Sequence, residues 1–274
     1  RSPQGYSSAA SDVYKRQVMA SIVDSLSEAF LDTFAPLKLV GFAIPVYFAI
    51  VSFMDGNLPM LYLWYGVISL LFLALLTQGI YNVRRSKREI LSLNPWALVK
   101  DLVKTIVAVL PNAVVWFGAA YLISQNVTIP VEVDWAQKVF TWVLFSIVFA
   151  IVMTSYLSFA KTMKVVQAYN YKVIFDSCVD VLIALFFYVL QLALVQVVLF
   201  GPVAYLYSFF RVPFTHWTFL FYSSIVAVVD LSITANYLAQ IAYECIPGNN
   251  EEYDNNYDAP IDLIDEAAER MNGK

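Results

Sequence analysis

Six long apolar stretches constrain the fold of this chain more than any other feature. Each is close to the length of about 20 residues that an α-helix needs to cross a hydrocarbon core about 30 Å thick. The sequence therefore predicts an all-α, polytopic membrane helix bundle with six transmembrane helices. The predicted spans are residues 37–54, 60–80, 102–123, 139–159, 179–200 and 219–241.

The composition supports a membrane protein and argues against a soluble domain. Hydrophobic residues make up 60% of the 274 residues and charged residues only 14%, whereas a soluble domain carries about 25% charged residues. A soluble chain of this length could not bury so many apolar side chains in one core. The two cysteines, Cys178 and Cys245, are too few to form a disulfide framework.

Basic residues in the short connections predict the orientation of the spans, because Lys and Arg near span ends stay on the cytoplasmic side. The connections between spans two and three and between spans four and five are rich in them, whereas the other three connections hold only Lys138 and Arg211. We therefore expect both termini on the cytoplasmic side of a bacterial inner membrane. The basic residues assigned to that side are Arg84, Arg85, Lys87, Arg88, Lys100, Lys104, Lys161, Lys164 and Lys172.

The chain divides into three parts. Residues 1–17 resemble a translated sequencing adaptor, so we interpret residues 1–18 as a non-native segment, with a genuine disordered extension as the alternative. Residues 19–246 form the six-span domain. Residues 247–274 form an acidic cytoplasmic tail, and apolar residues at helical spacing predict a short amphipathic helix at 260–271.

Two further helical features are expected on the cytoplasmic side. Residues 21–34 alternate apolar and acidic residues at helical spacing, which predicts an amphipathic interfacial helix before the first span. Asn94 followed by Pro95 reads as a helix N-cap with proline in the first turn. We expect that helix to bury Trp96 and Val99 and to continue into the third span.

The sequence contains no recognisable catalytic, cofactor or metal motif. It has no glycine-rich phosphate loop, nucleophile elbow, zinc-protease helix or paired CxxC. The single histidine, His216, lies beside Trp217 in an aromatic connection, and we interpret it as an interfacial residue. We therefore expect a protein that is not an enzyme, with no cofactor, no metal and no bound nucleic acid.

Asp230 is the ionisable residue nearest the centre of a span, where a carboxylate costs about 2.5–3.5 kcal/mol on insertion scales. Ser223 and Thr234 fall on the same helical stripe. Gln191 and Asn112 lie at a similar depth, ten to twelve residues from the inner ends of their spans. If the third, fifth and sixth spans pack together, these five side chains form a polar cluster at the membrane midplane.

This cluster has two interpretations. In one, Asp230 titrates as part of a proton or cation relay, or contacts a substrate. In the other, the cluster is a set of hydrogen bonds that holds helices together.

Asp176 and Asp180 share one face at the start of the fifth span. They are expected to form a solvated acidic patch, or alternatively a cytoplasmic cation vestibule.

The basic run of Arg84, Arg85, Lys87 and Arg88 is expected to contact anionic headgroups of the inner leaflet, worth about 1 kcal/mol for each residue. The same basic residues also set the orientation of the spans, because they keep this connection on the cytoplasmic side. The acidic tail has three interpretations: it pairs with the basic loops of the same chain, it binds a basic protein partner, or it is simply solvated. The sequence does not indicate an oligomeric state.

The layout resembles families of uncharacterised bacterial multi-pass membrane proteins. The similarity rests on an amphipathic lead-in, six spans, Asn-Val-Arg-Arg after the second span and Leu-Asn-Pro before the third. Such a resemblance implies a membrane topology and transfers no activity. The leading expectation is therefore a non-enzymatic membrane protein that acts through lipid or protein association. The alternative is a small-solute or ion transporter with a polar site around Asp230.

Overall fold

The computed structural model describes residues 34–84, 94–127 and 134–247, together with Ile22, Ser25, Leu26, Phe30 and Leu91. These residues form six long α-helices and one short 3-10 helix, with no strand among them. The elements are α3 (Ala35–Met54), α4 (Leu58–Arg84), α5 (Pro95–Asn126), α6 (Asp134–Thr162), η1 (Val165–Tyr169), α7 (Tyr171–Phe209) and α8 (Trp217–Glu244). The expected segment 1–18 and helix 260–271 lie outside the described residues.

The all-α fold class is confirmed. Each predicted span falls inside one helix, and all six helices are long and apolar enough to cross a membrane. The largest difference is in α7, which continues through Gly201 and Pro202 to Phe209, where the sequence had predicted an extramembrane connection. At about 1.5 Å per residue its 39 residues extend about 58 Å, well beyond the thickness of a hydrocarbon core.

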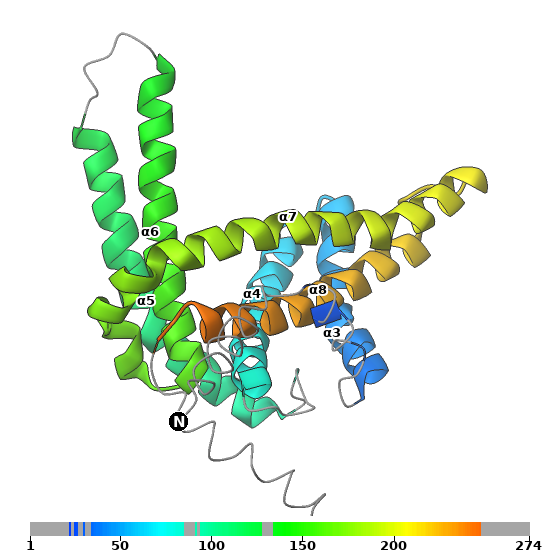
Figure 1. The fold of residues 1–274 in the computed structure, drawn as a ribbon. Coiled ribbons are helices and arrows are strands. Elements are labelled where there is room, and N and C mark those ends of the chain that lie inside the picture. The colour runs from blue at the N-terminus through cyan, green and yellow to red at the C-terminus, as the bar shows by residue number, and fades with distance from the viewer. Residues whose placement is uncertain are drawn as a thin grey trace, which may run out of the picture.

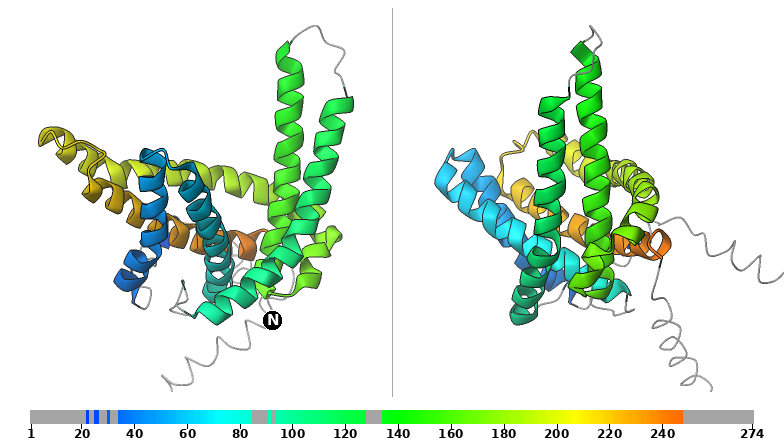
Figure 2. Two further views of the ribbon diagram at one scale, coloured as in Figure 1. Left: turned by 180° about the vertical axis from the view of Figure 1, so that it is seen from behind. Right: turned by 90° about the vertical axis from the view of Figure 1, so that its left-hand side faces the viewer.

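Consecutive helices are connected as three hairpins, α3–α4, α5–α6 and α7–α8, whose tips project in different directions (Figures 1 and 2). The hairpins also pack on one another, because α8 contacts α3 and α4 more extensively than it contacts α7. We call the centre where the hairpins meet the hub; it contains the end of α4, the start of α5, the α6–α7 connection with η1, and the C-terminal end of α8. The α7–α8 hairpin runs crosswise to the α5–α6 hairpin (Figure 1). The described connections with few basic residues, at 55–57 and 210–216, lie at the tips of the α3–α4 and α7–α8 hairpins, away from the hub.

In α5, most of the buried side chains are small or polar, and large apolar side chains face outward. In α5 the buried residues are Leu98, Thr105, Ala108, Asn112 and Ala120. Trp96 and Val99, which we expected to be buried, are 79% and 53% exposed. The hydrocarbon of a bilayer is as apolar as a protein core, so burial of apolar area does not drive membrane helices together. Small residues at an interface help because they allow two helices to approach closely.

Pro111 explains how η1 is held against α5. A proline inside a helix has no N–H, so the carbonyl four residues earlier loses its partner. That carbonyl belongs to Val107, and the Tyr169 hydroxyl of η1 donates to it over 3.0 Å. The N-cap of α5 is as predicted, because Asn94 Oδ1 accepts from the backbone N–H of Trp96 at 3.1 Å and of Ala97 at 3.3 Å.

The N-terminal lead-in contacts the hub through the residues that the structure describes there. Ile22, Ser25, Leu26 and Phe30 are helical, and Ile22 and Ser25 are buried. Ser25 Oγ donates to Asn236 Oδ1 of α8 over 2.9 Å. The polar side of this segment therefore joins α8 through a buried hydrogen bond, in addition to the apolar packing that the sequence predicts.

We predict that Asn112→Leu destabilises the fold by about 2 kcal/mol, since it removes three hydrogen bonds worth about 0.6 kcal/mol each in a membrane protein. Unfolding of the full chain by SDS in mixed micelles measures this change. Asn126→Leu is the matched control in the same helix, because Asn126 is exposed and bonds only to Leu122 O. Equal effects of the two substitutions would contradict the interior role of Asn112.

Candidate functional site

The structure separates the side chains that the sequence predicted to meet at the midplane. The prediction required α5, α7 and α8 to pack together, but α5 packs mainly on α4, α6 and η1. Asn112 and Asp230 therefore belong to two different polar groups, and the proposed meeting of both with Gln191 is wrong. Similar depth in the membrane was a poor guide because it does not determine which helices are neighbours.

Asn112 lies in a group that joins α5, α6, η1 and α7. Its Nδ2 donates to Ser155 Oγ and to Ala168 O, both at 2.8 Å, and its Oδ1 accepts from the Tyr171 hydroxyl at 2.8 Å. Ser155 Oγ also donates to Ala168 O over 2.8 Å. Asn112 is only 2% exposed, so its amide holds these elements together and is not presented to a substrate.

Asp230 lies at the interface of α7 and α8. Its Oδ1 accepts from Gln196 Nε2 over 2.7 Å. Thr234 donates to the backbone carbonyl of Asp230 and shares a hydrogen bond with the Tyr188 hydroxyl. Gln191, which we expected beside Asp230, instead lies within hydrogen-bonding reach of Tyr237. The carboxylate is therefore partnered across the hairpin by Gln196, an amide five residues after the predicted one.

The remaining predicted residues do not join either group. Ser223 Oγ donates to the Phe219 carbonyl of its own helix over 2.9 Å. Asp176 and Asp180 are exposed near the start of α7, as expected of a solvated patch. Arg84 ends α4, and its side chain and the other three residues of the basic run lie outside the described part of the chain.

The sequence missed a third polar group, in the hub between α4, α5 and α6. Thr77 Oγ1 shares a 3.1 Å hydrogen bond with the Tyr156 hydroxyl and accepts from Thr105 Oγ1 over 3.3 Å. Gln78 Nε2 donates to Asp101 Oδ2 over 3.4 Å. The polar residues of these three helices were the available signal in the sequence, but hydroxyl groups are common in membrane helices and indicate no partner.

The sequence also missed two buried lysines. Lys38 is 2% exposed and Lys161 is 8% exposed. Lys161 Nζ donates to the carbonyl of Ile246, just after α8, over 2.9 Å. Lys161 therefore ties the end of α6 to the end of α8, although the sequence suggested only a basic residue that sets orientation.

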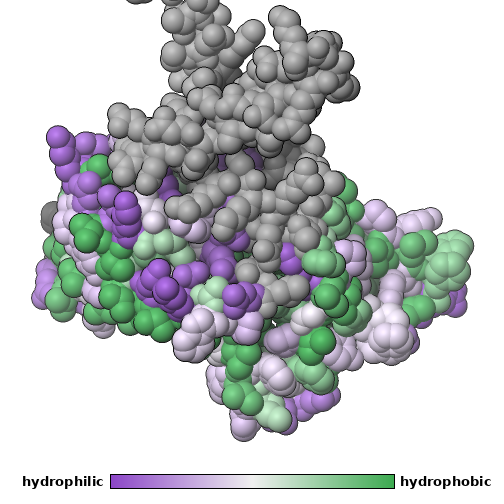
Figure 3. Space-filling model, turned by 90° about the horizontal axis from the view of Figure 1, so that it is seen from below, coloured by the Kyte–Doolittle hydropathy of each residue, from purple (hydrophilic) through white to green (hydrophobic). Residues whose placement is uncertain are grey.

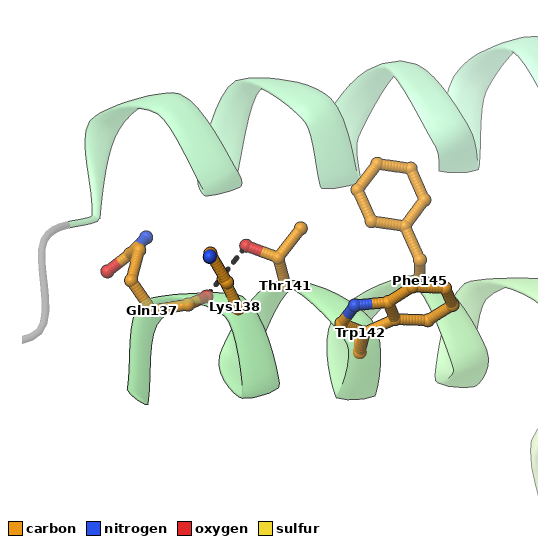
Figure 4. A pocket seen from close by; sticks show the side chains of 5 residues that line it. All are labelled: Gln137, Lys138, Thr141, Trp142 and Phe145. Atoms are coloured by element: carbon orange, nitrogen blue, oxygen red, sulfur yellow. Dashed lines mark hydrogen bonds between the residues drawn. The ribbon is translucent and has the colours of Figure 1, made fainter. Parts of the chain in front are cut away.

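A groove of about 490 Å³ lies near the tip of the α5–α6 hairpin. Its lining residues come from the first three turns of α6 and face the neighbouring helix or the groove mouth (Figure 4). They are Gln137, Lys138, Thr141, Trp142 and Phe145. We call this the α6 groove. Its size falls in the range of about 300–1,000 Å³ that is typical of small-molecule sites.

The chain matches no known family model, and no curated protein or solved structure is similar to it. The part of the chain that the structure describes holds no group of three or more His, Cys, Asp or Glu residues placed to bind a metal ion. Any assignment of function therefore depends on the geometry of the helices and their polar groups.

We predict that Cys245 is a slow nucleophile at neutral pH. Burial, followed by the nearby charges of Glu244 and Asp180, raises the pKa of this thiol to about 11. The thiolate is the reactive form, so the alkylation rate should rise about tenfold for each pH unit from 7 to about 10. Iodoacetamide labelling of the full chain with Cys178→Ser measures it; a rate that levels off below pH 9 would contradict the prediction.

Proposed function

We propose that this chain is a non-enzymatic multi-pass membrane protein that acts by associating with lipids and other proteins. In this proposal it resides in a bacterial cytoplasmic membrane, with the hub and both termini on the cytoplasmic side. The hairpin tips lie on the opposite side. The distribution of basic residues supports this orientation, because the tip connections hold only Lys138 and Arg211.

The observation that supports association most strongly is the exposed apolar surface of the hairpins. In α3, α4, α5 and α7 only 17–22% of the most apolar window is buried within the chain. Soluble monomers rarely expose contiguous apolar patches larger than a few hundred Å². These helix faces therefore have to be covered by lipid or by partner helices.

Polar surface is concentrated elsewhere. Seen from below, hydrophilic residues gather on the left and centre-left of the visible surface, whereas the part that extends to the right shows mainly hydrophobic and intermediate residues (Figure 3). A hub that faces water and hairpins that face lipid fit the proposed orientation. Anionic headgroups at the basic run and a basic partner for the acidic tail would add contacts on the same side.

Because the hairpins lie crosswise, association with lipid or a partner would also affect their relative orientation. For all six helices to cross one flat bilayer, the α7–α8 hairpin has to turn toward the direction of the α5–α6 hairpin. The hydrogen bonds between α5, α6, η1 and the start of α7 lie near the hub, and the outer half of α7 is largely exposed. Lipid or a partner that covers these exposed faces would therefore influence the relative orientation of the hairpins.

The second candidate function is transport of an ion or small solute past Asp230. It is favoured by one observation, the polar line of Gln196, Asp230, Thr234 and Tyr188 across the α7–α8 interface. Transporters place such groups at the midplane beside interrupted helices. In this chain α8 is one continuous helix from Trp217 to Glu244, and Asp230 already has an amide partner, so we place association first.

We predict that Asp230→Asn leaves proton flux unchanged in vesicles that contain the full chain, because an asparagine Oδ1 still accepts from Gln196. A pH-sensitive dye inside the vesicles measures the flux. Asp176→Asn, on the exposed face of α7, removes the same charge and serves as the control. A flux that Asp230→Asn abolishes and Asp176→Asn preserves would contradict association and support transport.

A further inference from the structure

The α6 groove changes from polar to aromatic along its length. Gln137, Lys138 and Thr141 lie toward the start of α6, and the rings of Trp142 and Phe145 lie farther along the helix (Figure 4). Lys138 directly precedes the predicted span at 139–159. A bilayer shows the same order, with charged headgroups outside, ester groups next and acyl chains inside. The polar and aromatic residues of the groove therefore follow one another in the same order as the headgroup and the acyl chain of a lipid.

Two hydrogen-bond donors of the groove remain available. Gln137 Nε2 donates to Val127 O over 3.0 Å, and Thr141 Oγ1 donates to Gln137 O over 2.9 Å. Within the described residues, neither the Lys138 ammonium nor the Trp142 indole N–H has a hydrogen-bond or ion-pair partner. Trp142 is 75% exposed on a lipid-facing helix, where an indole N–H requires an acceptor from its surroundings.

The spacing of these donors matches one class of ligand. Lys138 and Trp142 are four residues apart, so they lie on one helix face about 6 Å apart along the axis. A glycerophospholipid carries a phosphate and, closer to the membrane centre, ester carbonyls. The wall beyond Trp142 is aromatic, since Phe145 stacks on Phe117 of α5 with ring centroids 6.2 Å apart. That wall suits an acyl chain.

We propose that the α6 groove binds a diacyl glycerophospholipid with a net negative headgroup. The Lys138 ammonium donates to the lipid phosphate, the Trp142 indole N–H donates to an ester carbonyl one turn deeper, and one acyl chain lies against Trp142 and Phe145. A choline headgroup would bring its own cation near Lys138, so the charge of the site favours an anionic lipid. This inference rests on the proposed membrane location and names a specific lipid partner on the side of the hairpin tips.

The test is a binding titration of the full chain, purified in detergent and freed of lipid. Phosphatidylglycerol and phosphatidylcholine with brominated acyl chains are added separately, and quenching of tryptophan fluorescence reports binding. Lys138→Gln removes the cation, and Trp142→Phe removes the N–H donor and keeps a ring. The matched controls are Arg211→Gln and Trp217→Phe, which make the same changes at exposed positions of the α7–α8 tip.

We expect the original chain to bind phosphatidylglycerol more tightly than phosphatidylcholine. Lys138→Gln should weaken phosphatidylglycerol binding about fivefold, which corresponds to ~1 kcal/mol for one basic residue at an anionic lipid, and should remove the preference. Trp142→Phe should weaken the binding of both lipids and reduce the quenching at saturation, whereas the other exposed tryptophans keep their share of it. Both controls should behave as the original chain, and an unchanged helical circular-dichroism spectrum would show that each variant is folded.

Three results would overturn the inference: equal affinity for the two lipids, equal effects of Lys138→Gln and Arg211→Gln, or displacement of the lipid by millimolar inorganic phosphate. The last result would indicate a simple anion site without a role for the acyl chain. Flotation with vesicles separates this failure from a failure of the proposed function. A chain that floats with vesicles but shows no lipid preference contradicts the groove alone, whereas a chain that stays unbound in water contradicts both.

Discussion

The architecture depends on polar side chains that find partners between helices. In an apolar environment an unpaired amide or hydroxyl is costly, and apolar area gives no preference for one helix neighbour over another. The Asn112 amide satisfies this constraint most completely, because it bonds to α6, η1 and α7 at once. The bond from Lys161 to Ile246 adds the end of α8 to the same region. The hub is therefore the part of the molecule that specifies which elements meet.

The outer halves of the hairpins differ from the hub in the side chains that they expose. They expose valine, leucine, phenylalanine and tryptophan to the surroundings, and few polar groups link one hairpin to another there. α8 also packs on α3 and α4, so surrounding lipid or protein acts mainly on the faces that this packing leaves exposed, as the proposed association requires. The α6 groove extends this reasoning to one position, where Lys138 and Trp142 present donors at the level expected for headgroups.

The sequence predicted the features that depend on local chemistry. The six spans, the N-cap at Asn94 and the hairpin order all follow from hydropathy, side-chain capping and connection length. Helix neighbours could not be predicted in this way. In a soluble protein the apolar face of a helix marks the core, but in α5 both faces are apolar and all the buried residues except Leu98 are small or polar. This explains why Trp96 was expected inside and why Asn112 was assigned to Asp230 rather than to Ser155. The continuation of α7 was missed because Gly201-Pro202 resembles a helix end, although a membrane helix tolerates proline.

The proposed topology requires that the apolar hairpins cross a bilayer and leave the basic connections on one side. Single cysteines introduced into the full chain at Lys87, Asn57 and Val212, in a background without Cys178 and Cys245, test it through labelling of intact cells by a membrane-impermeant maleimide. We predict that cysteines at Asn57 and Val212 are labelled from outside and that a cysteine at Lys87 is labelled only after the cells are opened. Labelling of the Lys87 position in intact cells, or protection of all three positions, would contradict the account.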